Sequence, residues 1–178
     1  MMKKILFFIL CIQSLVFSQE KKVTKNGEVT FEASVPAFEE VKATNNGVSC
    51  VLNTETGEIA SLALVKGFRF KIALMEEHFN ENYAESTKFP KAIFKGKIQN
   101  FDLSKLTDKA QKFVINGTLE FHGKKKEIQS EALIKLVNGK IDIVTHFSVN
   151  SDDFDIKIPS VVSKKVSKKV NVDSHFVL

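Results

Sequence analysis

Apolar and polar residues alternate with a period of two along most of this chain, and this pattern constrains the fold more than any other feature. Val29, Phe31 and Ala33, for example, are separated by threonine and glutamate. The same alternation recurs in the segments 48–52, 59–72, 92–98, 113–121, 126–137, 141–149 and 170–178. A strand with one apolar and one polar face packs against a single core, as strands of antiparallel sheets do.

Sequences that favour tight turns separate these segments. Asn138-Gly139 is the strongest hairpin sequence in the chain. Further turns are predicted at 45–47, 54–57, 122–124 and 150–155, a polar lead-in at 19–26 and a short helical turn within 37–43. Short connections join antiparallel neighbours, so about eight strands predict a mainly β protein, either a closed barrel or a sandwich. An eight-stranded barrel is wide enough to hold one small ligand.

One segment departs from the alternation and predicts a single amphipathic helix over 74–85. Its apolar side carries Leu74, Met75, His78, Phe79 and Tyr83. The helix is followed by a break at Lys88-Phe89-Pro90, after which the next strand begins. Before it, Lys66 falls on the apolar face of the strand 59–72, which predicts a bulge near Gly67.

The first 18 residues predict a signal peptide. A basic start is followed by an apolar run at 5–17, and cleavage is expected near Ser18-Gln19. This run is too short for a transmembrane span, and Leu10 before Cys11 argues against a lipoprotein site. The chain is therefore expected to be exported, with one domain over 19–178. Cys50 alone then remains, so we expect a small buried residue and no disulfide within the chain.

Lysines cluster at 124–126 and 164–169. Such clusters attract a membrane surface or nucleic acid, but lysines on strand edges and loops are also an ordinary solvated surface that discourages edge pairing. The second interpretation is preferred, and no nucleic-acid partner is predicted.

The sequence does not contain the usual arrangements of catalytic or metal-binding residues. Glu76-Glu77-His78 has no second histidine four residues away, as a zinc protease helix requires. His122 lies in a predicted turn, and the spacing of His146 and His175 places them on outward faces. No nucleophile elbow or phosphate-binding loop occurs. We therefore predict no catalytic residue, no metal site and no cofactor.

Three parts of the chain resemble one known family. Residues 75–96, MEEHFNENYAESTKFPKAIFKG, are similar to the central segment of the YceI-like domain family, in the form common in Bacteroidetes-type bacteria. Residues 117–123, GTLEFHG, resemble its G-x-L-x-x-H-G strand and turn, and residues 153–156, DFDI, resemble its D-F-x-I segment. The resemblance implies a lipocalin-like antiparallel barrel that holds a long isoprenoid chain, in a protein exported to the periplasm. Residues 34–46 depart from the family's usual opening.

An apolar stripe is the candidate ligand site. Phe is the dominant aromatic residue, with 16 Phe against one Tyr and no Trp, and its ring needs wholly apolar surroundings. The residues predicted to converge on the interior are Phe31, Phe68, Phe70, Met75, Phe79, Phe94, Ile98, Phe113, Leu119, Phe147 and Phe176. The residues alone fit a solid core or a cavity equally, and the resemblance favours a cavity. His78, Asn82 and Tyr83 are candidate contacts for a polar head group, although each also suits an ordinary packing or capping role.

Three functions remain open at this point. The preferred one is an exported carrier or sequestering protein for a hydrophobic small molecule of the polyisoprenoid or lipid type. The second is an enzyme acting on such a lipid, with His78 and Glu77 as an acid–base pair. The third is a cell-envelope interaction module that uses Lys164, Lys165, Lys168 and Lys169.

Overall fold

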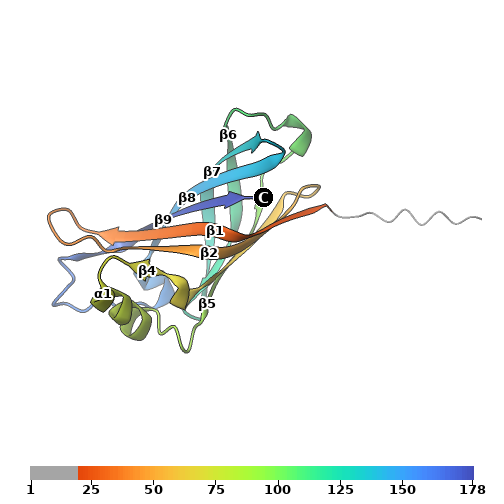
Figure 1. Ribbon diagram of the computed structural model, residues 1–178. Coiled ribbons are helices and arrows are strands. Elements are labelled where there is room, and N and C mark those ends of the chain that lie inside the picture. Colours follow the sequence, from red (N-terminus) through yellow and green to blue (C-terminus); the bar gives the residue numbers. More distant parts are fainter. Residues whose placement is uncertain (1–19) are drawn as a thin grey trace, which may run out of the picture.

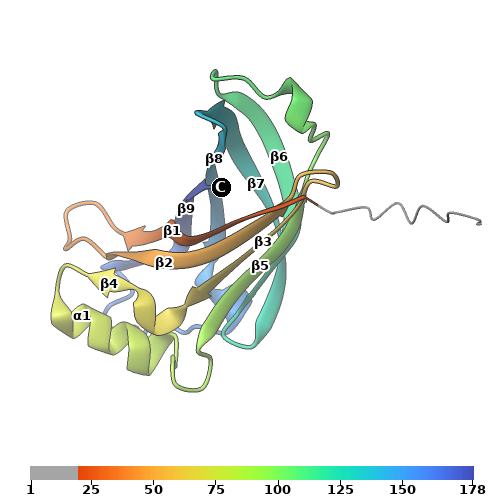
Figure 2. The ribbon, with the colours of Figure 1, turned by 45° about the vertical axis from the view of Figure 1, so that its right-hand side comes forward.

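The computed structural model describes residues 20–178, which form a closed antiparallel β-barrel of eight strands with one short helix (Figures 1 and 2). The predicted signal peptide and its cleavage site lie outside the described residues. The strands are β1 (Lys21–Ser34), β2 (Lys42–Asn53), β3 (Glu58–Leu64), β5 (Lys91–Ile98), β6 (Gln111–Phe121), β7 (Lys124–Val137), β8 (Lys140–Asn150) and β9 (Val166–Val177). A two-residue strand, β4 (Arg69–Phe70), pairs with β2. The predicted fold class is confirmed.

The strands follow one another around the barrel in the order β1, β9, β8, β7, β6, β5, β3, β2, and β1 pairs with β2 to close the ring. Chain neighbours pair directly at β1–β2, β2–β3, β5–β6, β6–β7, β7–β8 and β8–β9, as short connections require. The hairpin predicted at Asn138-Gly139 is confirmed. Both residues have positive φ angles, 52° and 76°, which suit the tight turn between β7 and β8.

The turn predicted at 45–47 is wrong, because β2 continues through it. Gly27 pairs with Val48 while Val29 pairs with Asn45, so Asn46 and Gly47 stand opposite a single residue of β1. The turn-favouring sequence therefore forms a bulge inside a strand. The buried Asn45 side chain stabilises it, donating to the Leu64 carbonyl and accepting from the Gly47 amide.

Two strand boundaries also differ from the prediction. Residues 21–26 of the predicted polar lead-in are instead the start of β1, where Lys21 pairs with Asn53 and lengthens the seam that closes the barrel. The strand predicted over 59–72 ends at Leu64. A 3-10 turn at Val65–Gly67 follows. The Val65 amide donates a hydrogen bond to the carbonyl of Pro90, the residue before β5. The helical turn predicted within 37–43 is a loop and the start of β2.

The predicted helix is confirmed, with slightly different ends. It comprises α1 (Ala73–His78) and a π-helical turn at Phe79–Tyr83, and it lies beside one end of the barrel (Figure 2). Glu76 joins it to β4, because its carboxylate accepts from the Arg69 guanidinium at 2.8 Å and from the Phe70 amide at 3.1 Å. Two further 3-10 turns occur at Leu103–Lys105 and Ser151–Phe154.

The opposite end of the barrel is filled with side chains. Along each strand, the inward residues toward this end are buried in a continuous core. Its fully buried members include Leu52, Ile98, Ile134, Ile141 and Ile143. Phe101, from the connection between β5 and β6, packs on Phe113 with ring centroids 6.3 Å apart and closes this end.

The close approach of β5 and β6 depends on two paired glycines. Gly96 lies directly opposite Gly117, and the Phe94 ring lies over both. A Cβ on Gly117 would collide with the Lys95 carbonyl and would lie 2.6 Å from the Gly96 Cα atom. Both obstacles are backbone atoms, so a side-chain rotation cannot relieve the overlap.

Gly117→Ala is therefore expected to lower the free energy of unfolding by about 2 kcal/mol, the usual scale for overpacking. Gly47→Ala is the matched control, because a Cβ added to Gly47 would lie 3.6 Å from its nearest neighbour, the Asn45 side-chain oxygen. We expect the control to stay within about 0.5 kcal/mol of the unchanged protein in urea denaturation. Equal stability of the two variants would contradict this account of the β5–β6 contact.

Cys50 is a buried core residue, 2% exposed, as predicted. Burial raises the pKa of its thiol to about 12. An unfolded thiol ionises above about pH 8.5, so the folded state holds this proton more tightly. The stability that this group contributes is therefore complete below that pH and decreases as the solution becomes more alkaline.

We expect Cys50→Ala to remove this alkaline dependence. Between pH 9 and 10, the difference in unfolding free energy between the two proteins should change by about 1.2 kcal/mol. Contributions from all other groups are common to both proteins and cancel in the difference. A difference that is constant across this range would show that the Cys50 thiol ionises equally well in the folded state.

Candidate ligand-binding cavity

The end of the barrel beside α1 is hollow. A cavity of about 680 Å³ occupies it and is lined by residues from all eight barrel strands, from β4 and α1, and from two loops. Since the inward faces of the strands are apolar, most of the wall is built from Val, Ile, Ala and Phe side chains. The cavity therefore arises from the same alternation that fills the opposite end with a solid core.

Most of the predicted site residues lie on this wall. The apolar ones that line the cavity are Phe31, Phe68, Phe70, Met75, Phe79, Phe94, Leu119, Phe147 and Phe176. Ile98 and Phe113 do not; they belong to the filled end of the barrel. His78 and Tyr83 also line the cavity, whereas Asn82 is exposed on the π-helical turn outside its wall. Whether any of these side chains contacts a ligand stays a prediction.

Four phenylalanines hold α1 and β4 against the barrel wall. The Phe31 ring of β1 lies 5.2 Å from Phe68, 5.7 Å from Phe70 and 5.1 Å from Phe79, measured between centroids. Phe79 also contacts Phe68 and Phe70. Edge-to-face and tilted ring pairs of this kind stabilise a contact beyond the apolar area that they bury. The helix is thereby fixed as one wall of the cavity.

A pair of rings crosses the interior of the barrel. Phe94 is on β5 and Phe147 is on β8, and β6 and β7 separate these two strands in the sheet. Their rings are nonetheless stacked, with centroids 6.5 Å apart and planes inclined by 22°. Side chains from two separate strands therefore meet within the lumen and narrow it.

The mouth of the cavity includes residues that the sequence pattern did not single out. They come from the β1–β2 loop, with Ala37, Phe38, Glu39 and Val41, and from the segment before and into β9, with Ile156, Ile158, Val162, Lys165, Val166 and Ser167. Apolar residues do not recur at a regular spacing in these two segments, so the sequence does not predict which of their side chains face the interior. The loop also lies within 34–46, where the chain departs from the family's usual opening.

Hydroxyl groups interrupt the apolar wall on the β7–β8–β9 side. Ser130, Thr145 and Ser174 line the cavity and are buried. Ser130 donates to the carbonyls of Glu131 and His146. The Ser151 hydroxyl is buried on the cavity wall without a hydrogen-bond partner among the described residues. A buried hydroxyl without a partner is unfavourable, so this group lowers the stability of the wall.

His122 joins three segments at the end of the barrel that carries the cavity. Its side chain is only 10% exposed and lies edge-on to Phe89, with centroids 4.5 Å apart. One ring nitrogen bonds the Phe154 carbonyl and the other bonds the Glu85 carboxylate, each at 2.8 Å. Both partners only accept hydrogen bonds, so the two bonds form together only when each nitrogen carries a proton. His122 thus ties the β6–β7 turn to the chain after α1 and to the turn after β8.

Two surface ion pairs also link the start of β7 to the turn after β8. The Lys126 ammonium bonds Asp153 at 2.9 Å and the Lys124 ammonium bonds Asp155 at 2.6 Å. These hydrogen bonds hold the pKa of each carboxyl below its usual value. His146 and His175 are exposed and pair with Asp173 and Asp142, as their predicted outward orientation requires.

The ionisable side chains on the cavity wall lie at its mouth. Glu39 is on the β1–β2 loop, His78 and Tyr83 are on the helical segment, and Lys165 directly precedes β9. Among residues 20–178, no group of three or more His, Cys, Asp or Glu side chains is placed to hold a metal ion. The interior itself presents rings, aliphatic groups and a few hydroxyls. Such a surface is suited to enclosing an apolar molecule.

A family model described as "YceI-like domain" matches residues 20–178. Among solved structures, a polyisoprenoid binding domain from Saccharophagus degradans, implicated in plant cell wall breakdown, superposes with a TM-score of 0.75 at 14% identity, covering 88% of this chain and 96% of that one. BcnA from Burkholderia cenocepacia superposes with a TM-score of 0.71 at 12% identity, covering 85% of this chain and 96% of that one. A Campylobacter jejuni YceI protein superposes with a TM-score of 0.65 at 16% identity, covering 81% of this chain and 87% of that one. No curated protein sequence matches the chain.

No helix in the part of the chain that the structure describes has the length and apolar character needed to cross a membrane.

The His122 contacts generate a stability prediction. His122→Ala removes two bonds and leaves the Phe154 carbonyl buried without its partner, so we expect the free energy of unfolding to fall by about 1–3 kcal/mol. His146→Ala is the matched control, because the His146–Asp173 pair is solvent-exposed and such pairs contribute at most about 1 kcal/mol. Urea denaturation measures both variants. A loss in the control as large as that in His122→Ala would contradict the proposed role of the buried histidine.

Proposed function

We propose that this chain, which belongs to the YceI-like domain family, is an exported binding protein that encloses a long hydrophobic ligand in its barrel. The ligand class that we propose is a polyisoprenoid or a related lipid, and the role is to carry or sequester it. The observation that carries the proposal is the apolar cavity of about 680 Å³, open at one end of an otherwise solid barrel.

The size and chemistry of the cavity support a ligand of this class. Its volume falls within the range of about 300–1,000 Å³ that is usual for small-molecule sites. Transfer of each methylene group from water into such a site is favourable by about 0.8 kcal/mol. A flexible hydrocarbon chain gains this free energy along its whole length without needing polar partners. The few hydroxyl residues on the wall, such as Ser130, Thr145 and Ser174, suit a ligand that also carries an isolated polar atom.

The family and a structural neighbour support the same ligand class. The neighbour from Saccharophagus degradans is described as polyisoprenoid binding, and its barrel corresponds to most of this chain. For export, the support is the sequence itself, in which a basic start and an apolar run precede the described residues. We infer a periplasmic or secreted location from this leader.

Binding is a better account of the cavity than catalysis. The histidine considered as an acid–base residue, His78, is exposed at the mouth, and Glu77 beside it is also exposed and is not part of the cavity wall. General acid–base catalysis requires the reacting group within hydrogen-bond reach of a positioned side chain. The deep wall, where a bound chain would lie, offers hydroxyls but no ionisable group.

Organic extraction of the purified protein followed by mass spectrometry tests the proposal. We expect a long-chain hydrophobic compound in stoichiometric amount, and uptake of an added polyprenol by the extracted protein. Phe147→Asp should reduce that uptake at least about tenfold, since it places a charge on the apolar wall. Phe147→Leu is the control that retains an apolar surface, and thermal unfolding shows whether each variant is folded. Absence of any extracted compound together with failure to take up polyprenols would refute the proposed function.

A further inference from the structure

The mouth of the cavity is surrounded by exposed apolar side chains. Phe38 on the β1–β2 loop is 47% exposed, Leu74 on α1 is 57% exposed and Val161 on the loop before β9 is 83% exposed. Each lies next to residues of the cavity wall: Phe38 is itself one of them, Leu74 precedes Met75, and Val161 precedes Val162. Three segments that are distant in sequence thus present apolar groups around one opening. We call these three residues the apolar rim.

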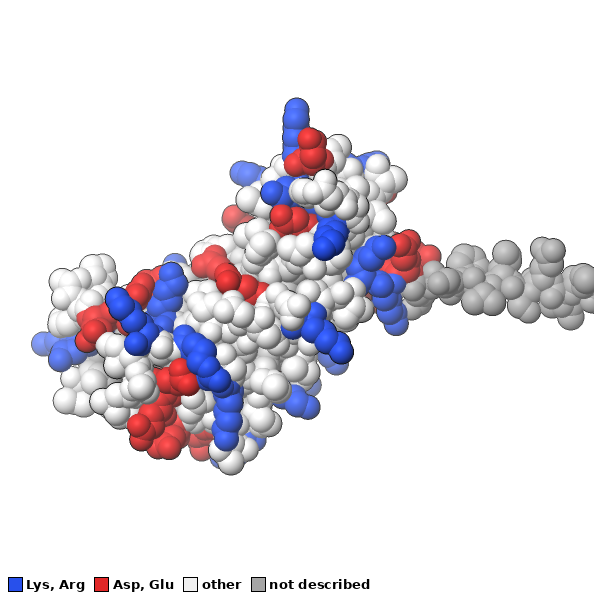
Figure 3. Space-filling view, viewed as in Figure 1, with Lys and Arg blue, Asp and Glu red and all other residues white. Residues whose placement is uncertain are grey.

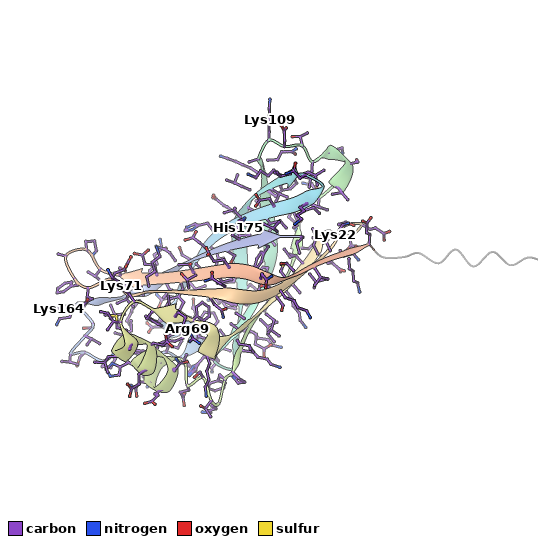
Figure 4. All side chains as sticks on the ribbon, viewed as in Figure 1. Lys22, Arg69, Lys71, Lys109, Lys164 and His175 are labelled. Carbon is purple, nitrogen blue, oxygen red and sulfur yellow. The ribbon has the colours of Figure 1, made fainter. Side chains whose placement is uncertain are left out.

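Lysines without ion-pair partners accompany the apolar rim. Lys71 lies just before α1, and Lys157, Lys164 and Lys165 lie on the segment that carries Val161. None of these four forms a salt bridge with another described residue, whereas Lys124, Lys126 and Lys168 nearby do. Figure 4 places Lys71 and Lys164 at the same end of the molecule, beside the β1–β2 loop.

Acidic residues are also present at this end. Glu39 and Glu40 follow Phe38, and Glu77 is exposed on α1. Figure 3 accordingly shows side chains of both charges side by side at this end. The lysines are concentrated on the segment of Val161, whereas the segment of Leu74 carries Lys71 together with the exposed Glu77 and Glu81. An anionic surface would therefore be met first by the Val161 segment.

We propose that the apolar rim and its lysines dock the mouth of the barrel onto an anionic lipid bilayer, where ligand enters and leaves. This inference rests on the proposed function, because a ligand of that class dissolves in bilayers and not in water. A mouth held against a bilayer lets the chain pass between two apolar surroundings without exposure to solvent.

The chemistry of the rim selects a bilayer over a protein partner. Apolar side chains next to lysines suit the membrane interface, where the apolar groups enter the acyl boundary and the ammonium groups meet lipid phosphates. A stable protein interface instead requires a continuous complementary surface of about 1,000 Å² or more. Here the three apolar groups lie on segments beside an opening, so part of any such interface would be hollow. A fluid bilayer tolerates that geometry because its own acyl chains face the opening.

Flotation with lipid vesicles tests the docking. The full chain is mixed with vesicles of phosphatidylcholine, with or without phosphatidylglycerol, and the bound fraction is measured. We expect binding to the vesicles that contain phosphatidylglycerol. Replacing Lys71 and Lys164 by Gln should weaken that binding about fivefold for each lysine. Combining Leu74→Asp with Val161→Asp should weaken it at least about tenfold.

Matched controls separate docking from folding and from ligand binding. Val23→Asp with Leu133→Asp changes one Val and one Leu that are exposed on the outside of the barrel and are not part of the cavity wall, and it should bind vesicles as the unchanged protein does. Leu74 and Val161 are not part of that wall either. Their double variant should therefore take up a polyprenol dispersed in solution normally, while extracting it from vesicles more slowly.

Each outcome of these experiments supports or overturns one of the two proposals. If the unchanged protein does not bind vesicles containing phosphatidylglycerol, or if both aspartate pairs weaken binding equally, the docking proposal is overturned. It is also overturned if light scattering shows a dimer that the Leu74→Asp, Val161→Asp pair dissociates, because the rim is then covered by a second copy. Failure to take up dispersed polyprenol, with vesicle binding intact, refutes the proposed function instead.

Discussion

The pairing of β1 with β2 and β9 is the constraint on which the rest of the structure depends. It converts a row of antiparallel strands into a ring, so that every inward side chain faces the same enclosed space. A closed sheet has no free edges, and its interior is shielded from water by the walls alone. Near one end, large aliphatic side chains and the Phe101–Phe113 contact fill this space. Toward the other end, α1 lies beside the opening instead of inside it, so the space remains hollow.

Much of this architecture follows from the sequence because two-residue alternation and turn chemistry are local properties. They identify which side of each strand is inside, and they identify hairpins such as Asn138-Gly139. They do not determine how far along the barrel a residue lies. Ile98 and Phe94 share one face of β5, yet Ile98 is in the filled core and Phe94 is on the cavity wall. The position of a residue along the barrel axis depends on strand tilt and register, and long-range strand pairing determines both.

The difference between local pattern and long-range pairing also explains which predictions were wrong or incomplete. Asn45 and Gly47 favour a turn by themselves, but they form a bulge because β1 pairs with β2 on both sides of them. His122 lies in a predicted turn, and nothing in its sequence neighbourhood indicates that Glu85 and Phe154 will meet its two nitrogens. The mouth segments have no periodic pattern, so their contribution to the wall emerges only from the folded chain.

The Phe94–Phe147 stack has a consequence for the shape of molecule that the barrel accepts. Because the two rings meet inside the lumen, they narrow the space between β5 and β8. A rigid, flat ring system as wide as the lumen would have to push these rings apart, whereas a thin, bendable chain could pass beside them. The stack would therefore favour a flexible ligand over a stiff one, where the surrounding wall selects only by polarity.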